Sequence, residues 1–315
     1  MRVRFGQIEA VRGVALTVLR GETHCLVGES GCGKSVTALA VMKLLARGAE
    51  CSADVVRFQD IDLRRMAERG MSRLRGNKLS MIFQEPMTSL NPAYTIGSQM
   101  AEVFQRHRGV RRTQALDRAA RLLERVGVTA PGMRLKQYPH QLSGGLRQRV
   151  MIAMALMCGP ELLIADEPTT ALDVTVQAQI LRLLQTLQRE LGLALLLITH
   201  DLGIVARMAH RVSVMYAGEI VETSPTDVLF SNPLHPYTRG LLACIPVPGV
   251  SRRDAPLGNI PGTVPRITAG FAGCAFRTRC AFAMPECAQE ATRRFDGTHA
   301  YLCRLPPEWT RATAA

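Results

Sequence analysis

The feature that most constrains this chain is a glycine-rich segment at residues 28–35, with the sequence GESGCGKS. A glycine, four further residues and then Gly-Lys-Ser is the spacing of a phosphate-binding P-loop. Glycines let backbone N–H groups come close to phosphate oxygens, while the lysine supplies a cation and the serine a hydroxyl for Mg²⁺. The residues that we expect to bind a nucleotide here are Gly28, Ser30, Gly31, Cys32, Gly33, Lys34 and Ser35.

The segments on either side of this loop fit the same interpretation. Residues 24–27 predict a short buried strand that enters the loop, and residues 36–45 predict the helix that leaves it. The N-terminus of such a helix carries a partial positive charge and faces the bound phosphates. This order of strand, loop and helix predicts an α/β fold.

Length and composition narrow the class of protein. A chain of 315 residues with a hydrophobic fraction of 47% has room for one large domain or two ordinary ones. No apolar run reaches the ~18 residues of a membrane span, and the N-terminus lacks a secretory signal pattern. We therefore expect a cytosolic protein that would reach a membrane only through a partner.

The net charge of +13 allows two interpretations. A basic surface can bind nucleic acid or an anionic membrane face, or the basic side chains can be spread over solvated helix faces. We favour the second, because Arg111-Arg112 and Arg252-Arg253 are only pairs and no block of Lys and Arg resembles a nucleic-acid-binding arm.

Hydrophobic periodicity and turn residues predict the order of the remaining elements. We expect strands within residues 1–23, 53–58, 79–83, 162–165, 194–199, 212–216 and 219–222. We expect helices over residues 66–75, from Ser143 as N-cap to Met157, and over 176–191. Residues 87–158 form a helical insertion in this scheme. Regular periodicity fades beyond Thr223, so we predict one domain at residues 1–222 and a second at 223–315.

Polar residues follow three of these strands and open one helix. Asp166 and Glu167 end a strand, where the first carboxylate can hold Mg²⁺ and the second can activate water. Gln84 ends another strand and can contact the metal and that water, and His200 ends a third and can hydrogen-bond the γ-phosphate. Residues 142–145 (LSGG) open a helix and make a second anion-binding N-terminus, which a second protomer in head-to-tail contact could use.

Taken together, these motifs resemble those of the nucleotide-binding subunit of ABC transporters over almost the whole chain. The resemblance makes residues 28–35 the Walker A motif, Gln84 the Q-loop, residues 142–148 the signature motif, 162–167 the Walker B motif, 171–173 the D-loop and His200 the switch histidine. It implies a P-loop NTPase with a RecA-like core, an antiparallel β subdomain, an inserted helical subdomain and a C-terminal extension.

The resemblance also implies roles for individual residues. Glu167, His200 and Gln84 would be catalytic, and Ser35, Gln84 and Asp166 would hold Mg²⁺. Phe5 lies where the family has an aromatic residue that stacks on adenine. Further nucleotide contacts would come from Ser143, Gly144, Gly145 and Asp173.

Within this family the chain is similar to the importers of di- and oligopeptides and of nickel. The similarity lies in residues 83–92, 173–179, 233–238 and 260–265. Three features depart from the family pattern. The first strand is short or missing at Met1, which bears on whether Met1 is the true start; Leu146 replaces a glutamine of the signature; and Phe5 replaces a tyrosine.

Four cysteines near the end of the chain need a separate interpretation. Cys274, Cys280, Cys287 and Cys303 match neither the spacing of the usual zinc pairs nor that of the ferredoxin run. Spacing alone leaves a metal site and four ordinary thiols equally open. The resemblance implies a [4Fe–4S] cluster, because importers of this branch carry one in this extension.

The sequence therefore predicts an ATPase, using ATP and Mg²⁺, that energises a peptide-type importer. The resemblance implies a second ATPase subunit in head-to-tail contact, two membrane permeases, an indirect solute-binding protein and a peripheral place on the cytoplasmic face of the inner membrane. It implies no nucleic acid. The alternatives are a non-transport ABC ATPase acting on nucleic acid or ribosomes, and a nucleotide-binding regulator without catalysis.

Overall fold

The computed structural model describes residues 1–85, 89–170, 172–245 and 258–309, which divide into two compact units. Unit 1 contains residues 1–17, 24–64 and 199–315, and unit 2 contains residues 18–23 and 65–198. Residues 86–88 of the expected Q-loop segment and Ala171 of the expected D-loop lie outside the described residues.

The main sheet of unit 1 has the strand order β12-β13-β11-β10-β3. Its five strands are β3 (Thr23–Val27), β10 (Arg211–Tyr216), β11 (Glu219–Pro225), β12 (Arg294–Asp296) and β13 (His299–Tyr301). Strand β10 runs parallel to β3 and antiparallel to β11. The predicted hairpin at Ala217-Gly218 is thus confirmed, with φ angles of 44° and 86° at its turn.

A smaller antiparallel sheet in unit 1 has the order β2-β1-β4. Its strands are β1 (Arg2–Phe5), β2 (Ile8–Val11) and β4 (Ala49–Ser52), and the hairpin β5 (Arg57–Phe58) and β6 (Ile61–Asp62) follows. The expected strand over residues 53–58 is wrong except at its end, since only Arg57 and Phe58 are in strand conformation. Helix α1 (Lys34–Val41) begins and ends earlier than residues 36–45.

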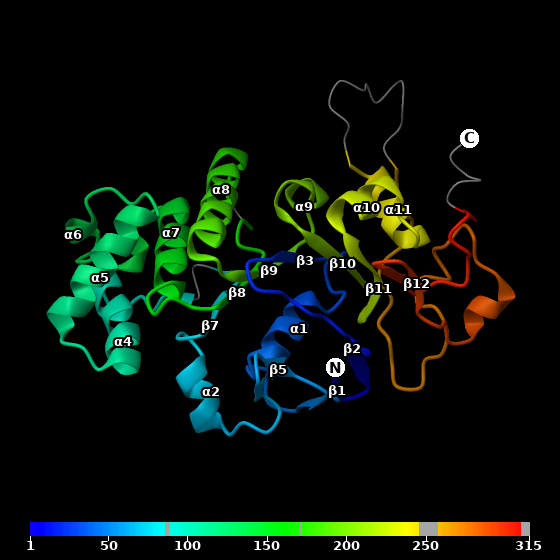
Figure 1. Cartoon of the computed structure of the whole chain (residues 1–315), viewed down its shortest axis with the longest axis horizontal. Coiled ribbons are helices and arrows are strands. Elements are labelled where there is room, and N and C mark those ends of the chain that lie inside the picture. The colour runs from blue at the N-terminus through cyan, green and yellow to red at the C-terminus, as the bar shows by residue number, and fades with distance from the viewer. Residues whose placement is uncertain (86–88, 171, 246–257, 310–315) are drawn as a thin grey trace. The chain divides into compact units, whose positions relative to one another are not determined.

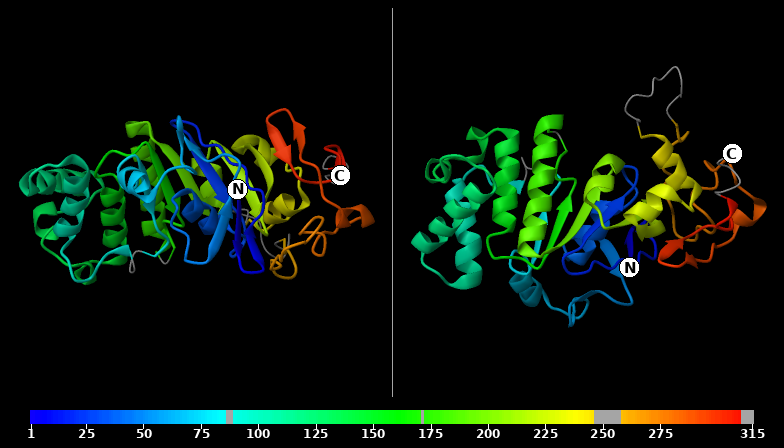
Figure 2. Two further views of the ribbon diagram at one scale, coloured as in Figure 1. Left: turned by 90° about the horizontal axis from the view of Figure 1, so that it is seen from below. Right: turned by 45° about the horizontal axis from the view of Figure 1, so that its top comes forward.

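The end of unit 1 is more regular than its sequence predicts. It contains α9 (Leu202–Met208), α10 (Thr226–Ser231), α11 (Pro236–Ala243) and the 3₁₀ turn η2 (Pro285–Ala288). Helices α10 and α11 lie beside each other in both Figure 1 and Figure 2. Buried aromatic side chains hold this part together, since the rings of Tyr216, Tyr237 and Phe276 lie within 4.6–5.3 Å of one another.

Unit 2 contains three parallel strands in the order β9-β8-β7. They are β7 (Leu79–Ile82), β8 (Leu162–Asp166) and β9 (Ala194–Thr199), and all three confirm predicted strands. Strand β9 is buried along its whole length, as expected for a strand covered on both faces. Helix α8 (Val174–Leu191) lies between β8 and β9 in the chain and buries Ile180, Leu184 and Leu187.

The remaining helices of unit 2 are α2 (Glu68–Leu74), α4 (Ile96–Arg108), α5 (Arg112–Arg125), α6 (Pro131–Arg134), η1 (Pro139–Gln141) and α7 (Gly144–Ala155). All of them except α2 lie within residues 87–158, the range that the sequence predicts as a helical insertion. Figure 1 shows α4, α5, α6 and α7 gathered in one bundle. Helix α5 buries Ala115, Ala119, Leu122 and Leu123 and exposes Arg112, Arg121 and Arg125, which is the amphipathic pattern of a surface helix.

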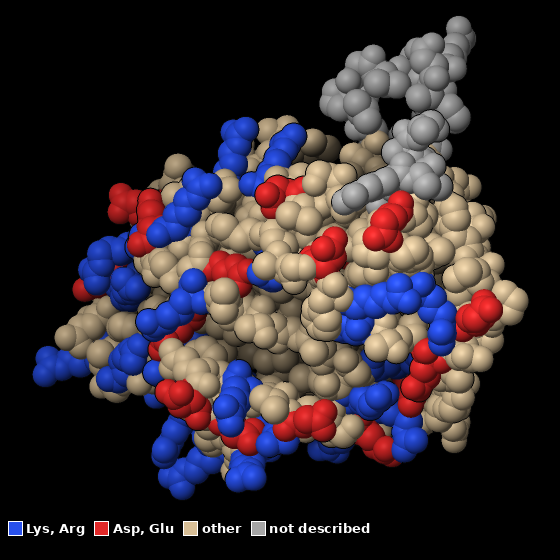
Figure 3. All heavy atoms as spheres, turned by 45° about the vertical axis from the view of Figure 1, so that its right-hand side comes forward, with Lys and Arg blue, Asp and Glu red and all other residues tan. Residues whose placement is uncertain are grey.

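Surface charge bears on whether the protein binds nucleic acid, and the hydropathy of its helices bears on whether it crosses a membrane. On the face in Figure 3, basic and acidic side chains are interspersed, and no single-sign field covers it. In the part of the chain that the structure describes, none of the helices combines the length and the apolar character needed to cross a bilayer.

Candidate nucleotide site

The P-loop of unit 1 connects β3 to α1, as the sequence predicts. Two of its glycines lie where no side chain fits. A Cβ on Gly33 would lie 2.4 Å from the Ala10 carbonyl oxygen, and one on Gly28 would lie 2.1 Å from that of Met215. Their φ angles of 107° and 153° are also conformations that side chains disfavour. The loop is therefore packed against β2 and β10 by its backbone.

Lys34 is the first residue of α1 and is 4% exposed. Its Nζ donates to the carbonyl oxygens of Gly28 and Glu29 at 2.8 and 3.0 Å. Through these two hydrogen bonds the Lys34 side chain folds back onto the P-loop. These backbone carbonyls supply hydrogen-bond acceptors for an ammonium that is shielded from water.

Two residues that the sequence did not single out contact the same loop. The Tyr237 hydroxyl accepts a hydrogen bond from the Glu29 N–H at 3.0 Å, and Arg279 pairs with the Glu29 carboxylate at 2.9 Å. Arg279 lies 250 positions away from Glu29, so no local pattern could have indicated this contact.

In unit 2, strand β8 ends in the predicted acidic pair. Asp166 is 3% exposed and closes the strand. Glu167 follows with a φ of 44°, which is a rare backbone conformation for a residue with a side chain. Its N–H donates to the Ile198 carbonyl of β9 at 3.0 Å, which fixes the carboxylate beyond the edge of the sheet. Strain held in this way is common at functional sites.

The Glu167 carboxylate is held by two polar side chains. Gln84, which follows β7, donates from Nε2 to Glu167 Oε2 at 3.3 Å, and the Thr170 hydroxyl donates to the same oxygen at 3.0 Å. The structure thus brings together two of the predicted site residues, Gln84 and Glu167, and adds Thr170, which the sequence analysis missed.

The predicted signature segment forms the start of α7 in unit 2. Ser143 is the N-cap, and its hydroxyl accepts from the Leu146 N–H at 3.4 Å, as expected. Gly145 has little room for a side chain, because a Cβ there would lie 2.9 Å from Val176 of α8. Gly144 precedes it with more space. The first turn of α7 therefore presents backbone N–H groups with little side-chain cover.

The other predicted site residues differ in their place in an element and in their exposure. Asp173 is the N-cap of α8 and accepts from the Val176 N–H at 3.0 Å. In unit 1, His200 follows β9 and is exposed, and Phe5 ends β1 and is partly buried. Ser30 and Gly31 lie in the P-loop, and Ser35 lies in the first turn of α1. The Cys32 thiol is 1% exposed, and burial raises its pKa.

The four clustered cysteines lie in the last part of unit 1. Burial, with smaller contributions from Cys274, Cys280 and Cys287, raises the pKa of the Cys303 thiol to about 11, so this thiol lies within electrostatic range of the other three. The Cys280 sulfur accepts from the Phe282 N–H at 3.4 Å.

These thiols supply suitable ligands for an iron–sulfur cluster but no ready-made site. Among the residues that the structure describes, no group of three or more His, Cys, Asp or Glu side chains is arranged to hold a metal ion. The geometry of the described residues therefore does not support the expected [4Fe–4S] cluster.

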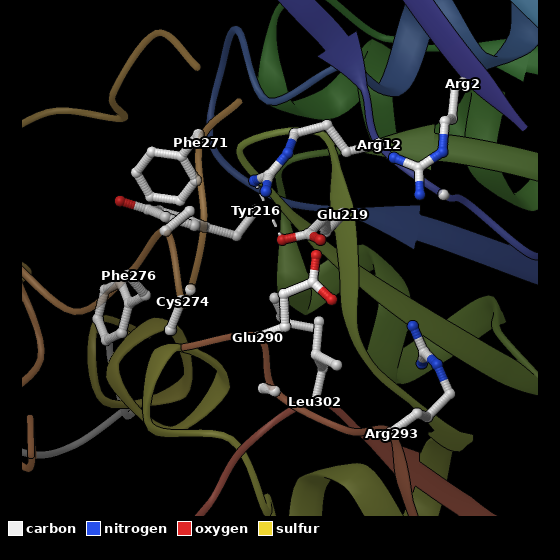
Figure 4. A pocket seen from close by; sticks show the side chains of 15 residues that line it. Arg2, Arg12, Tyr216, Glu219, Phe271, Cys274, Phe276, Glu290, Arg293 and Leu302 are labelled. Carbon is white, nitrogen blue, oxygen red and sulfur yellow. Dashed lines mark hydrogen bonds and ion pairs between the residues drawn. The ribbon is translucent and has the colours of Figure 1, made fainter. Parts of the chain in front are cut away.

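Unit 1 also contains a cavity of about 270 Å³ that is separate from the P-loop (Figure 4). The carboxylates of Glu219 and Glu290 point toward each other within it, and Arg12 pairs with Glu219 at 3.1 Å. Burial raises the pKa of Glu219, and Arg12 acts in the opposite direction. None of residues 28–35 lines this cavity, so it is not the predicted nucleotide site.

Comparison with known protein families agrees with these motifs. A family model described as "ABC transporter" matches residues 11–170. A second, described as "Oligopeptide/dipeptide transporter, C-terminal region", matches residues 221–287. The second match begins two residues before Thr223.

Individual relatives cover most of the chain. A Brucella melitensis protein named for ATP binding in peptide import is 53% identical over 296 residues, which cover 91% of this chain and 88% of the relative. The dipeptide transport ATP-binding protein DppD of Bacillus subtilis is 49% identical over 283 residues, which cover 90% of this chain and 84% of DppD.

Among solved structures, the ATP-binding cassette MJ0796, in a dimeric post-hydrolysis state bound to ADP and Pi, is similar to this chain. The TM-score is 0.60 at 26% identity, and the match covers 71% of this chain and 98% of that one. Together with the P-loop, the acidic pair after β8 and the capped α7, these matches establish the family. This chain belongs to the ABC transporter family and carries an oligopeptide/dipeptide transporter C-terminal region.

Proposed function

We propose that this chain is the ATP-hydrolysing subunit of an importer for di- or oligopeptides. The observation that carries the proposal is the Glu167 carboxylate, which stands beyond the end of β8 and accepts hydrogen bonds from Gln84 and Thr170. A carboxylate in that place can orient and deprotonate a water molecule for attack on a phosphate.

Each part of the predicted site then has a role in ATP hydrolysis. Residues 28–35 bind the phosphates through backbone N–H groups, and Lys34 moves from the Gly28 and Glu29 carbonyls to the terminal phosphates. Mg²⁺, when bound, neutralises phosphate charge, and Ser35, Asp166 and Gln84 are its proposed ligands. Glu167 is the proposed base, His200 contacts the γ-phosphate, and Phe5 stacks on adenine.

A second ATPase subunit completes each nucleotide site in this proposal. Ser143, Gly144 and Gly145 form the capped start of α7, where free N–H groups favour an anion. They would contact the nucleotide bound to the other subunit, with Asp173 at the contact. The dimeric state of the MJ0796 cassette supports such an arrangement.

The importer assignment rests on the relatives and on the C-terminal region. The match to the oligopeptide/dipeptide transporter region favours transport over the non-transport ABC class. The relatives named for peptide and dipeptide transport support a peptide as the solute. We propose two membrane permeases and a solute-binding protein as partners. We also propose a peripheral place on the cytoplasmic face of the inner membrane, and domains at residues 1–222 and 223–315.

A [4Fe–4S] cluster on Cys274, Cys280, Cys287 and Cys303 is the further part of this proposal. Its support is the proximity of the thiols: Cys280 and Cys287 act on the pKa of Cys274, all three act on that of Cys303, and backbone N–H groups act on the sulfurs of Cys274, Cys280 and Cys303. Anaerobic purification should then yield brown protein with about four irons and four sulfides per chain. Colourless protein, or protein with stoichiometric zinc, would reject the cluster without affecting the ATPase assignment.

Uptake of labelled peptides by cells tests the transport function. Cells that carry the wild-type chain and its permeases should accumulate a labelled di- or oligopeptide, and cells with Glu167→Gln in the same amount should not. Equal uptake by both would contradict the proposal. Membranes from the same cells, extracted in detergent, should yield the permeases bound to this chain and no RNA.

A further inference from the structure

Arg279 of the C-terminal region makes a two-pronged ion pair with Glu29 of the P-loop, and both residues belong to unit 1. Its Nη1 and Nη2 atoms donate to Oε1 and Oε2 of Glu29 at 2.9 and 3.1 Å. The arginine side chain is 5% exposed and that of Glu29 is 28% exposed. A bidentate pair that is largely shielded from water is both stronger and more directional than a surface salt bridge.

Several further contacts hold the guanidinium in place. Its Nε donates to the Pro261 carbonyl at 2.7 Å and its Nη2 to the Ile260 carbonyl at 3.1 Å. The Tyr216 hydroxyl accepts from Nη1 at 3.3 Å, and the guanidinium carbon lies 5.7 Å from the centre of the Tyr216 ring. Arg279 is thus fixed by its own segment and by β10, and the segment presents it to the P-loop in one orientation.

Glu29, for its part, is held at three points. Its carboxylate pairs with Arg279, its N–H donates to the Tyr237 hydroxyl, and its carbonyl accepts from Lys34. Two of these three partners come from the C-terminal half of unit 1. The carbonyls of Gly28 and Glu29 that receive Lys34 are therefore set in place from outside the loop.

We propose that Arg279 is a positioning residue for ATP binding, which makes the C-terminal region part of the nucleotide-binding apparatus. The inference rests on the proposed binding of ATP at residues 28–35. When Lys34 leaves the Gly28 and Glu29 carbonyls for phosphate, the loop loses two internal hydrogen bonds. The Arg279–Glu29 pair and the Tyr237 contact then remain to keep the first turn of the loop open to phosphate.

This role predicts a specific kinetic pattern. Loss of Arg279 should weaken ATP binding, because the loop must be ordered again at each binding event, and it should leave the chemical step at saturating ATP nearly unchanged. A charge-assisted hydrogen-bonded pair of this burial is consistent with a loss of roughly tenfold in ATP affinity.

The experiment compares ATP affinity and turnover in six full-length variants. They are Arg279→Ala, Arg279→Lys, Glu29→Gln, the double variant Arg279→Ala/Glu29→Gln, Lys34→Ala and the control Arg277→Ala. The control removes a neighbouring arginine that donates to the Ala272 carbonyl of its own segment and lies over the Phe271 ring. The dissociation constant for ATP is measured by titration calorimetry, and kcat and KM by phosphate release.

We expect Arg279→Ala to raise Kd and KM roughly tenfold with kcat within about twofold, and Arg279→Lys to lie between it and the wild type. The double variant should be no worse than Arg279→Ala, since the two residues act as one pair. Arg277→Ala should match the wild type.

The inference is overturned if Glu29→Gln and the folded Arg279 variants all bind ATP as the wild type does. It is also overturned if the loss of ATP affinity in the double variant is the combined loss of Arg279→Ala and Glu29→Gln. If Arg279→Ala does not fold, the ATP affinity of Glu29→Gln alone tests the inference, because glutamine keeps the size of the glutamate side chain. Lys34→Ala separates this result from the proposed function. If Lys34→Ala also binds ATP normally, the nucleotide site itself is misplaced; if it does not, only the role of Arg279 fails.

Discussion

Gln84 and Glu167, 83 positions apart in the chain, are joined by a hydrogen bond of 3.3 Å between Nε2 and Oε2. The contact exists because β7 and β8 run parallel, with Ile82 paired to Ala165. The residues that follow two neighbouring parallel strands therefore leave the sheet at the same edge. The predicted metal-contacting amide and the predicted catalytic carboxylate are thus hydrogen-bonded to each other at this edge.

Removing the amide of Gln84 should slow hydrolysis and leave ATP binding nearly intact. Gln84→Ala takes away one of the two side-chain donors to Glu167, so the carboxylate becomes less well oriented for water activation. We expect kcat to fall about tenfold, with the dissociation constant for ATP changed less than about threefold. Phosphate release and nucleotide titration measure the two quantities. A fall in affinity with kcat unchanged would assign Gln84 to binding.

Two substitutions at Asp173 separate its capping role from its charge. The carboxylate caps α8 by accepting from the Val176 N–H. Asp173→Ala should lower the free energy of unfolding by about 1 kcal/mol, and Asp173→Asn should keep most of it, because asparagine caps equally well. Urea unfolding of both variants measures the difference. Equal stability of the two variants would show that the cap contributes little.

The buried imidazole of His235 should make the protein sensitive to mild acid. Burial lowers its pKa to about 4, the nearby Glu222 carboxylate acts in the opposite direction, and Nδ1 accepts from the Tyr237 N–H at the start of α11. An unfolded histidine titrates near 6.5. Between pH 6.5 and 4 the unfolded chain therefore binds a proton that the native protein does not, and stability falls as the pH falls.

The variant His235→Asn tests this contribution, since asparagine can still cap α11 without titrating. The free energy of unfolding should drop between pH 7 and pH 5 by about 2 kcal/mol more in the wild type than in the variant. The comparison cancels the titrating groups that the two proteins have in common and that do not contact residue 235. Parallel pH profiles would mean that His235 is not the titrating group.

Local sequence signals were sufficient for the elements that position the site. Strands β7, β8 and β9 are short apolar runs that end in polar residues, and Ser143 caps α7 as predicted. These features depend on neighbours in the chain, which is why the sequence indicates them. The pairing of Gln84 with Glu167 could be expected once both strands were placed in one parallel sheet.

The contacts of the C-terminal region could not be predicted in the same way. Helices α10 and α11 have only six and eight residues, too few for a clear period. The pair of Glu29 with Arg279 depends on tertiary packing alone. The expected strand over residues 53–58 was wrong because only its last two residues pair in a hairpin, and cysteine spacing said nothing about whether four sulfurs converge.

Glu167→Gln measured beside the wild type tests the central claim most directly. The claim is that Glu167 activates water while other residues bind the nucleotide, and glutamine keeps the size of the side chain without a base. We predict that the variant binds MgATP with wild-type affinity and releases phosphate at least about a hundredfold more slowly. Hydrolysis at the wild-type rate, with ATP bound equally well, would contradict the account.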